Sequence, residues 1–144
     1  MGTGAQPLVL HANAVAVDGR GLLIRGRSGS GKSTMALELM ARGAVLVADD
    51  RVLIDPREDG SLWMSAPPTI AGLIEARGIG ILNAEILDCA PVAAILDLDE
   101  TEAHRLPPVR KTLLINRSIP VLHNCATPGF AAAVLQYLRG GRKD

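Results

Sequence analysis

Eight consecutive residues, 26–33, carry the clearest chemical signal in the sequence. They read Gly-Arg-Ser-Gly-Ser-Gly-Lys-Ser and match the phosphate-binding loop pattern G-x-x-x-x-G-K-[ST] throughout. In such a loop, backbone N–H groups at a helix start face a polyphosphate, the lysine reaches the β- and γ-phosphates, and the hydroxyl ligates Mg²⁺. We therefore predict that the chain binds a nucleoside triphosphate. The residues expected around the phosphates are Gly26, Arg27, Ser28, Gly29, Ser30, Gly31, Lys32, Ser33 and Thr34.

Two adjacent carboxylates, Asp49 and Asp50, follow the apolar run 44–48. In phosphate-loop enzymes an aspartate at the end of an apolar strand commonly belongs to the Mg²⁺ shell, and a second one can accept a proton from an attacking hydroxyl. The alternative is a turn-forming acidic pair that caps the strand. We predict Asp49 as a metal residue and the pair as the source of a catalytic base, without deciding which of the two is the base.

The segment 74–82 places charged residues and glycines inside an otherwise apolar stretch. Glu75 can complete a metal shell, and Arg77 can bind phosphate oxygens through two parallel hydrogen bonds. Gly78 and Gly80 allow the backbone conformations that a tight loop needs. A buried Glu–Arg pair with structural glycines is an equally good interpretation of the same residues.

The elements that must position these residues are short apolar strands and two helices. Hydrophobic periodicity and turn residues predict a helix directly after the loop and another near the C-terminus, so the expected class is α/β with a mixed sheet in one domain over residues 1–144. The predicted strands are 8–17, 22–25, 44–48, 52–55, 62–65, 92–98, 112–115 and 119–122, the predicted helices are 33–42 and 128–138, and one or two helical turns are expected at 70–76.

Composition excludes several classes of protein. Hydrophobic residues make up 48% of the 144 residues but aromatic residues only 2%, so the core must be aliphatic. The net charge is zero without a long basic run, which argues against a nucleic-acid partner. Residues 1–7 lack the pattern of a signal peptide, and no apolar run reaches the ~18 residues of a membrane span. Cys89 and Cys125 show no metal-ligand spacing. We therefore expect a cytoplasmic protein.

Taken together, four blocks of the sequence resemble one family. His11, the loop 26–33, the block Leu-Val-Ala-Asp-Asp-Arg at 46–51 and the block Glu-Ala-Arg-Gly-Ile-Gly-Ile at 75–81 are similar, in order and spacing, to the catalytic domain of HPr kinase/phosphorylase. The resemblance covers about residues 8–98. It implies a fold like phosphoenolpyruvate carboxykinase, a homo-hexamer, and ATP- and Mg²⁺-dependent phosphorylation of a serine on an HPr-type phosphocarrier protein of the phosphotransferase system.

The resemblance also implies roles for single residues. Lys32 and the loop would hold the phosphates, Ser33 and Glu75 would ligate Mg²⁺, and one residue of the pair Asp49 and Asp50 would take the proton from the target serine. A lone histidine carries little signal by itself, but His11 matches an active-site histidine of the family. Arg105 resembles an arginine that the family uses late in the domain. The predicted catalytic residues are thus His11, Lys32, Asp49, Asp50 and Arg105.

The sequence departs from the family at two places. It starts almost at the kinase motif, so it resembles a truncated form without the family's N-terminal domain. Residues 127–131 read Thr-Pro-Gly-Phe-Ala, without the arginine of the family stretch linked to phosphorolysis, so a charge partner for the reverse reaction is missing. Reverse phosphorylase activity is therefore not among the expected activities. A small-metabolite kinase and a non-catalytic nucleotide sensor are the alternative functions.

Overall fold

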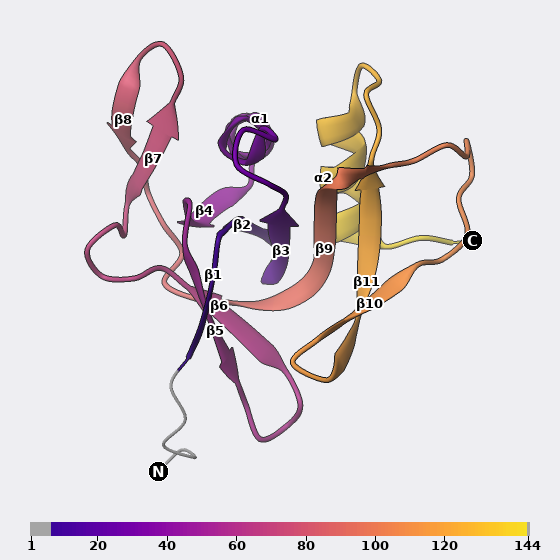
Figure 1. Cartoon of the computed structure of the whole chain (residues 1–144), viewed down its shortest axis with the longest axis horizontal. Coiled ribbons are helices and arrows are strands. Elements are labelled where there is room, and N and C mark those ends of the chain that lie inside the picture. The colour runs from indigo at the N-terminus through magenta and orange to yellow at the C-terminus, as the bar shows by residue number, and fades with distance from the viewer. Residues whose placement is uncertain (1–6, 144) are drawn as a thin grey trace.

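Short strands and two helices account for most of the chain (Figure 1). The computed structural model describes residues 7–143, so the expectation about a signal peptide lies almost wholly outside the described residues. The helices are α1 (Lys32–Ala41) and α2 (Phe130–Gly140). The strands are β1 (Leu8–Leu10), β2 (Ala12–Val17), β3 (Arg20–Arg25), β4 (Val45–Ala48), β5 (Val52–Pro56), β6 (Leu62–Ser65), β7 (Leu73–Ala76), β8 (Gly80–Asn83), β9 (Ala90–Thr101), β10 (Lys111–Leu114) and β11 (Arg117–Asn124).

Nine of the described strands form one mixed sheet. Its main order is β1-β5-β6-β9-β3-β2-β4, and β11 pairs with both β9 and β10. Strand β9 runs parallel to β3 and β11, whereas β2 is antiparallel to β3 and β4. In Figure 1, β9 curves from the β5–β6 hairpin up to β3 and β11. Strand β3 is therefore held on both sides, which fixes the start of the loop that leaves it.

Alternation along the strands divides the core between the two faces of the sheet. Leu22 and Ile24 pack with the buried residues of α1 and α2, whereas Leu23 points to the other face. On that other face, Leu23 belongs to one buried cluster with side chains of the β5–β6 hairpin and of β10–β11. The largest fully buried side chains are all Leu, Ile, Val or Met. The core is aliphatic, as the composition predicts.

The predicted α/β class, with a mixed sheet, a helix after the loop and a C-terminal helix, is confirmed. One element was predicted wrongly. Residues 70–76 do not form helical turns, because Leu73–Ala76 is strand β7, which pairs with β8 through Ile74 and Leu82. Gly78 lies in the turn between them and Gly80 begins β8, and their φ angles of 89° and 137° do not occur in an α-helix.

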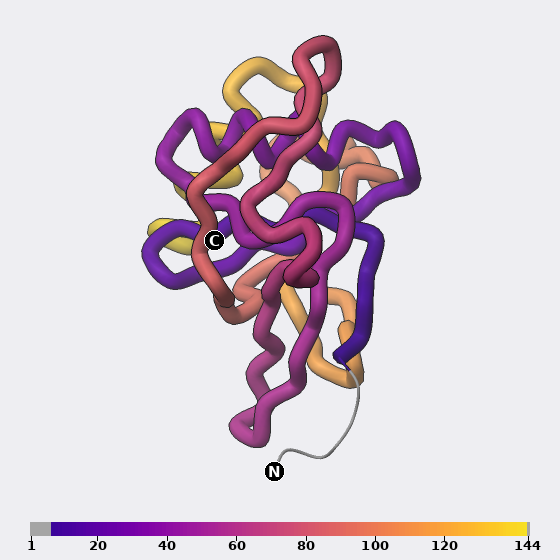
Figure 2. Tube along the Cα trace, turned by 90° about the vertical axis from the view of Figure 1, so that its left-hand side faces the viewer, coloured from indigo at the N-terminus to yellow at the C-terminus, as the bar shows by residue number. Residues whose placement is uncertain are grey.

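The predicted strand 8–17 is also interrupted. A bend at His11 separates β1 from β2, because β1 pairs with β5 whereas β2 pairs with β3 and β4. The β7–β8 hairpin stands apart from the main sheet beside α1 and projects from one end of the molecule in both views (Figures 1 and 2). The β5–β6 hairpin projects from the opposite end.

No helix within residues 7–143 is long and apolar enough to cross a membrane. The two cysteines, Cys89 and Cys125, are free thiols.

Candidate functional site: a phosphate loop facing two carboxylates

The start of α1 is open toward solvent. Its N-cap residue, Gly31, makes no side-chain cap hydrogen bond, and the first turn contains no acidic residue. Gly29 and Gly31 have φ of 82° and 97°, a left-handed conformation that directs consecutive N–H groups into the concave side of the loop. The Lys32 ammonium donates to the carbonyls of Gly26 and Arg27, at 2.8 and 3.1 Å. A helix start without a side-chain cap presents its first N–H groups and its positive end to an anion.

Asp49 is buried beneath this loop and anchors three different elements. Its Oδ1 accepts hydrogen bonds from the Ser33 hydroxyl at 2.7 Å and from the Asn13 side-chain amide. Its Oδ2 accepts the backbone N–H of Glu75 at 3.0 Å. Only 8% of Asp49 is exposed. This single carboxylate therefore fixes the first turn of α1, the strand β2 and the hairpin strand β7 relative to one another.

Asp50 has the opposite surroundings. Its side chain is 69% exposed, and its backbone has a φ of 70°, which is unusual for a residue other than glycine. The Asp50 N–H donates to the Asn13 side-chain oxygen at 3.2 Å, and the Asp50 carbonyl accepts from the N–H of Ala12 at 3.2 Å. These two backbone bonds hold the strained residue so that its carboxylate lies at the mouth of the cleft described next.

A cleft of about 230 Å³ brings most of the predicted residues together. Lys32 and Ser33 lie on the loop side, Asp50 follows β4, and Glu75 and Arg77 come from the β7 side of the hairpin. Glu75 and Arg77 are exposed rather than buried as a pair, so the structural interpretation of that segment does not hold. The full lining is Asn13, Ser28, Gly29, Gly31, Lys32, Ser33, Thr34, Asp50, Glu75 and Arg77.

The donor set fits a magnesium ion bound together with a nucleotide. The described residues contain no group of three or more His, Cys, Asp or Glu side chains that could hold a metal ion alone. Mg²⁺, however, is usually bound by one or two carboxylates and keeps waters and substrate phosphates as its other ligands. Ser33 and Glu75 line the same cleft and fit that requirement. Both oxygens of Asp49 already accept protein hydrogen bonds, and one of these bonds holds the Ser33 hydroxyl in position.

Two supporting groups escaped the sequence analysis. Asn13 is 1% exposed and links Asp49 to Asp50 through its side chain. Its mark in the sequence is a single amide inside an apolar strand, because a buried amide requires a hydrogen-bond partner. Asp99, at the end of β9, accepts the Arg27 N–H through both oxygens, at 3.1 and 2.9 Å. No local pattern in the sequence marks Asp99, because its partner lies in the loop 72 positions earlier.

Six predicted residues do not line this cleft. Gly26, Arg27 and Ser30 belong to the loop itself, Asp49 is buried beneath it, and the other two, His11 and Arg105, lie elsewhere. His11 is exposed in the bend between β1 and β2, and its neighbour Ala12 donates to the Asp50 carbonyl, so His11 lies at the margin of the site. Arg105 is exposed in the segment between β9 and β10 and lines a separate pocket against β11 and α2. Within one chain, the structure does not bring Arg105 to the phosphate loop.

Comparisons with known proteins agree on one family. The family described as the HPr Serine kinase C-terminal domain matches residues 4–89. A protein of Brevibacillus brevis named HPr kinase/phosphorylase is 36% identical over 143 residues, which cover 91% of this chain and 46% of that protein. A protein of the same name from Caldanaerobacter subterraneus is 49% identical over 83 residues, covering 58% of this chain and 27% of that protein. The chain thus spans less than half the length of these curated relatives.

A solved structure supports the fold. The Hpr(Ser) kinase/phosphatase from Coxiella burnetii superposes with a TM-score of 0.76 at 24% identity, over 92% of this chain and 88% of that chain. The match of the family therefore covers the first strands, the phosphate loop, the paired aspartates and the β7–β8 hairpin, which are the elements that build the cleft. The chain belongs to the family of the HPr serine kinase C-terminal domain.

Proposed function

We propose that this chain is a single catalytic domain that uses ATP and Mg²⁺ to phosphorylate a serine of an HPr-type phosphocarrier protein of the phosphotransferase system. The observation that carries the proposal is the arrangement across one cleft. An open helix N-terminus with Lys32 faces an exposed carboxylate, Asp50, whose one side-chain contact among the described residues is an ion pair with the exposed Arg51 at 3.9 Å. The first group suits a polyphosphate and the second suits a proton acceptor.

Each residue has a distinct task in this proposal. The loop N–H groups and Lys32 bind the phosphates, so Lys32 must exchange its two loop carbonyls for phosphate oxygens. Arg77 neutralises charge from the hairpin side. Bound at Ser33 and Glu75, Mg²⁺ would supply positive charge to the β- and γ-phosphate oxygens. The positions of these groups, rather than covalent chemistry by the protein, lower the barrier.

The transfer step follows from that geometry. The serine oxygen of the carrier forms a bond to the γ-phosphorus while the bond from that phosphorus to the bridging oxygen of ADP breaks. The serine proton passes to Asp50, because Asp50 is exposed at the cleft whereas both Asp49 oxygens are engaged. We assign Asp49 to holding Ser33 and the hairpin in place.

Self-association into the family's hexamer is part of the proposal. Two large apolar side chains, Leu106 before β10 and Leu113 on it, are 75% and 70% exposed. Exposed apolar side chains gathered on one region favour a protein contact. Light scattering after size-exclusion chromatography measures the assembly directly, and a monomer at micromolar concentration would remove this part of the proposal.

The test is transfer of labelled phosphate from ATP to candidate carrier proteins, each supplied as wild type and with its target serine changed to Ala. We expect serine-dependent, Mg²⁺-dependent labelling. Asp50→Asn should reduce the rate by roughly 10²–10⁴-fold, the usual range for removing a general base. The matched variant is Asp55→Asn, the same change at an exposed carboxylate of β5 outside the cleft lining, which should retain transfer. Nucleotide binding without transfer to any carrier would favour a metabolite kinase or a sensor.

A further inference from the structure

A second pocket lies beyond strand β9, on the side away from the phosphate loop. Its volume is about 270 Å³, and its walls come from residues 102–110 (here called the strap), from β11 and from α2. It shares no lining residue with the phosphate cleft. Nothing in the proposed transfer reaction uses this space.

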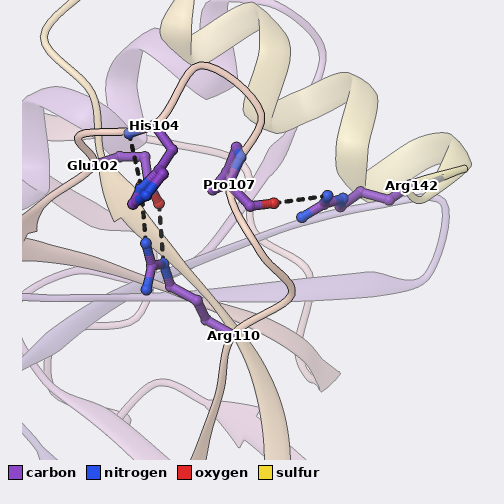
Figure 3. A network of polar contacts seen from close by, with 5 residues as sticks. All are labelled: Glu102, His104, Pro107, Arg110 and Arg142. Atoms are coloured by element: carbon purple, nitrogen blue, oxygen red, sulfur yellow. Dashed lines mark hydrogen bonds and ion pairs between the residues drawn. The ribbon is translucent and has the colours of Figure 1, made fainter.

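The strap is tied down at both ends and in the middle (Figure 3). Glu102 accepts two hydrogen bonds from the Arg110 guanidinium, at 3.1 and 2.9 Å, so the first and last residues of the strap are joined. Glu102 also accepts the His104 N–H at 3.2 Å, and Arg142, beyond α2, donates to the Pro107 carbonyl at 2.9 Å. The Arg110 pair lowers the pKa of Glu102 to about 2, so this tie persists at neutral pH. A pocket whose wall is already ordered loses little entropy when a ligand binds.

The walls of the pocket are mainly apolar. Pro107 and Val109 come from the strap, Leu122 comes from β11, and Phe130, Val134 and Tyr137 come from α2. Apolar walls with a few polar groups at the rim are the usual features of small-molecule sites, and the volume lies near the lower end of such sites. The body of a ligand must therefore be small and mostly apolar.

The charges that line the pocket select the polar end of that ligand. Arg105, Arg110 and Arg142 contribute three cations, and Glu102 is the one acidic residue in the lining. Arg110 already neutralises Glu102, and Arg142 is engaged by the strap. Arg105 is exposed and has no hydrogen bond or ion pair within residues 7–143. A carboxylate is the complementary group, because a guanidinium binds it through two parallel hydrogen bonds.

We propose that this pocket binds a small organic carboxylate, with its apolar body between the strap and α2 and its carboxylate at Arg105. The site is independent of the nucleotide cleft in its residues. Its existence does not depend on the proposed kinase activity, so failure of one leaves the other standing.

The experiment titrates the full chain with hexanoate, octanoate and 3-phenylpropionate, and with hexanamide as the uncharged analogue of the first. Backbone NMR shifts locate the binding. We expect saturable shifts at Ala133, Val134 and Tyr137, and none at Ser28 and Lys32. The affinity for hexanoate should be at least about tenfold higher than that for hexanamide, because a hydrogen bond to a charged group contributes at least a factor of ten in affinity.

Two variants with matched controls test the placement. Arg105→Ala should weaken carboxylate binding by about tenfold to a hundredfold, whereas Lys111→Ala, an exposed cation outside the lining, should not. Ala133→Phe should fill the pocket and abolish binding. Ala132→Phe, the exposed neighbour outside the lining, should leave binding unchanged and controls for effects of the bulky ring on α2.

The proposal fails on any of three results. These are no shift at α2 with any of the carboxylates at millimolar concentration, equal affinity for hexanoate and hexanamide, or binding that persists in Ala133→Phe. Thermal melts of all four variants show whether they are folded, and Arg105→Ala tests the proposal even if the Phe variant does not fold.

Discussion

The same isosteric change, Asp→Asn, should have very different effects on the stability of the protein at the neighbouring carboxylates Asp49 and Asp50. Asp49 accepts hydrogen bonds from the Asn13 amide, the Ser33 hydroxyl and the Glu75 N–H, and it is buried. An asparagine at this position offers one acceptor oxygen instead of two, and its NH₂ group must face at least one of those donors. The loss of a hydrogen bond to a charged acceptor and the burial of an unsatisfied donor together cost about 3 kcal/mol.

That cost is large enough to measure by thermal unfolding. For a chain of this size, 1 kcal/mol corresponds to roughly 4 °C, so Asp49→Asn should lower Tm by about 12 °C. The Asp50 side chain is 69% exposed, so Asp50→Asn should change stability by less than about 0.5 kcal/mol, or roughly 2 °C. The measurement is calorimetry at neutral pH without nucleotide, supported by urea titration. A Tm for Asp49→Asn within a few degrees of wild type, or an equal drop for Asp50→Asn, would refute the assignment of Asp49 as the structural anchor.

Three further outcomes are expected. A Cβ at Gly21 would lie 2.5 Å from the Pro91 carbonyl oxygen. Gly21→Ala should therefore lower the free energy of unfolding, measured by urea titration, by about 1–3 kcal/mol. An unchanged urea midpoint would contradict the close approach of β3 and β9. Asp99→Ala frees the Arg27 N–H of the loop, so isothermal titration should give roughly tenfold weaker ATP binding, and unaltered affinity would exclude a positioning role. Because the pKa of folded Glu102 lies at about 2 rather than 4.5, its contribution to stability is complete above pH 4.5 and is lost toward pH 2. The Tm difference between wild type and Glu102→Gln should therefore be constant above that range and shrink below it, and a difference independent of pH would count against the ion pair.

Both helices, the phosphate loop and most strands could be predicted because their signals are local, whereas the strands β7 and β8 were not predicted. Apolar runs such as 44–48 and 92–98 lie within β4 and β9 or one residue from their ends, since β-branched residues bounded by turns leave few other conformations. The loop pattern and Glu75 were found because the chemistry needs fixed residue types at fixed spacing, and the cleft indeed gathers Lys32, Ser33, Asp50, Glu75 and Arg77.

The remaining features depend on contacts between distant segments. The sequence predicts helical turns at 70–76 because a short apolar run has no clear period. Only the pairing with β8 makes Leu73–Ala76 a strand. The different surroundings of Asp49 and Asp50 arise from the left-handed backbone at Asp50, which turns the two side chains apart. The pocket at Arg105 exists because Glu102 and Arg110 join the two ends of the strap and Arg142 bonds its middle from beyond α2. No local sequence pattern predicts these contacts.

The parallel pairing of β3 with β9 has a consequence for how the protein is made. The paired residues Arg25 and Asp97 are 72 positions apart, so a ribosome adding about 5–20 residues per second needs roughly 4–14 s to supply the partner of β3. Throughout that interval, one edge of an apolar strand has no neighbour and is open to pairing with other nascent chains. The soluble yield should therefore depend more on chaperone supply and on slow translation at low temperature than on the stability of the folded protein. Fragments that stop before β9 should not assemble the phosphate loop.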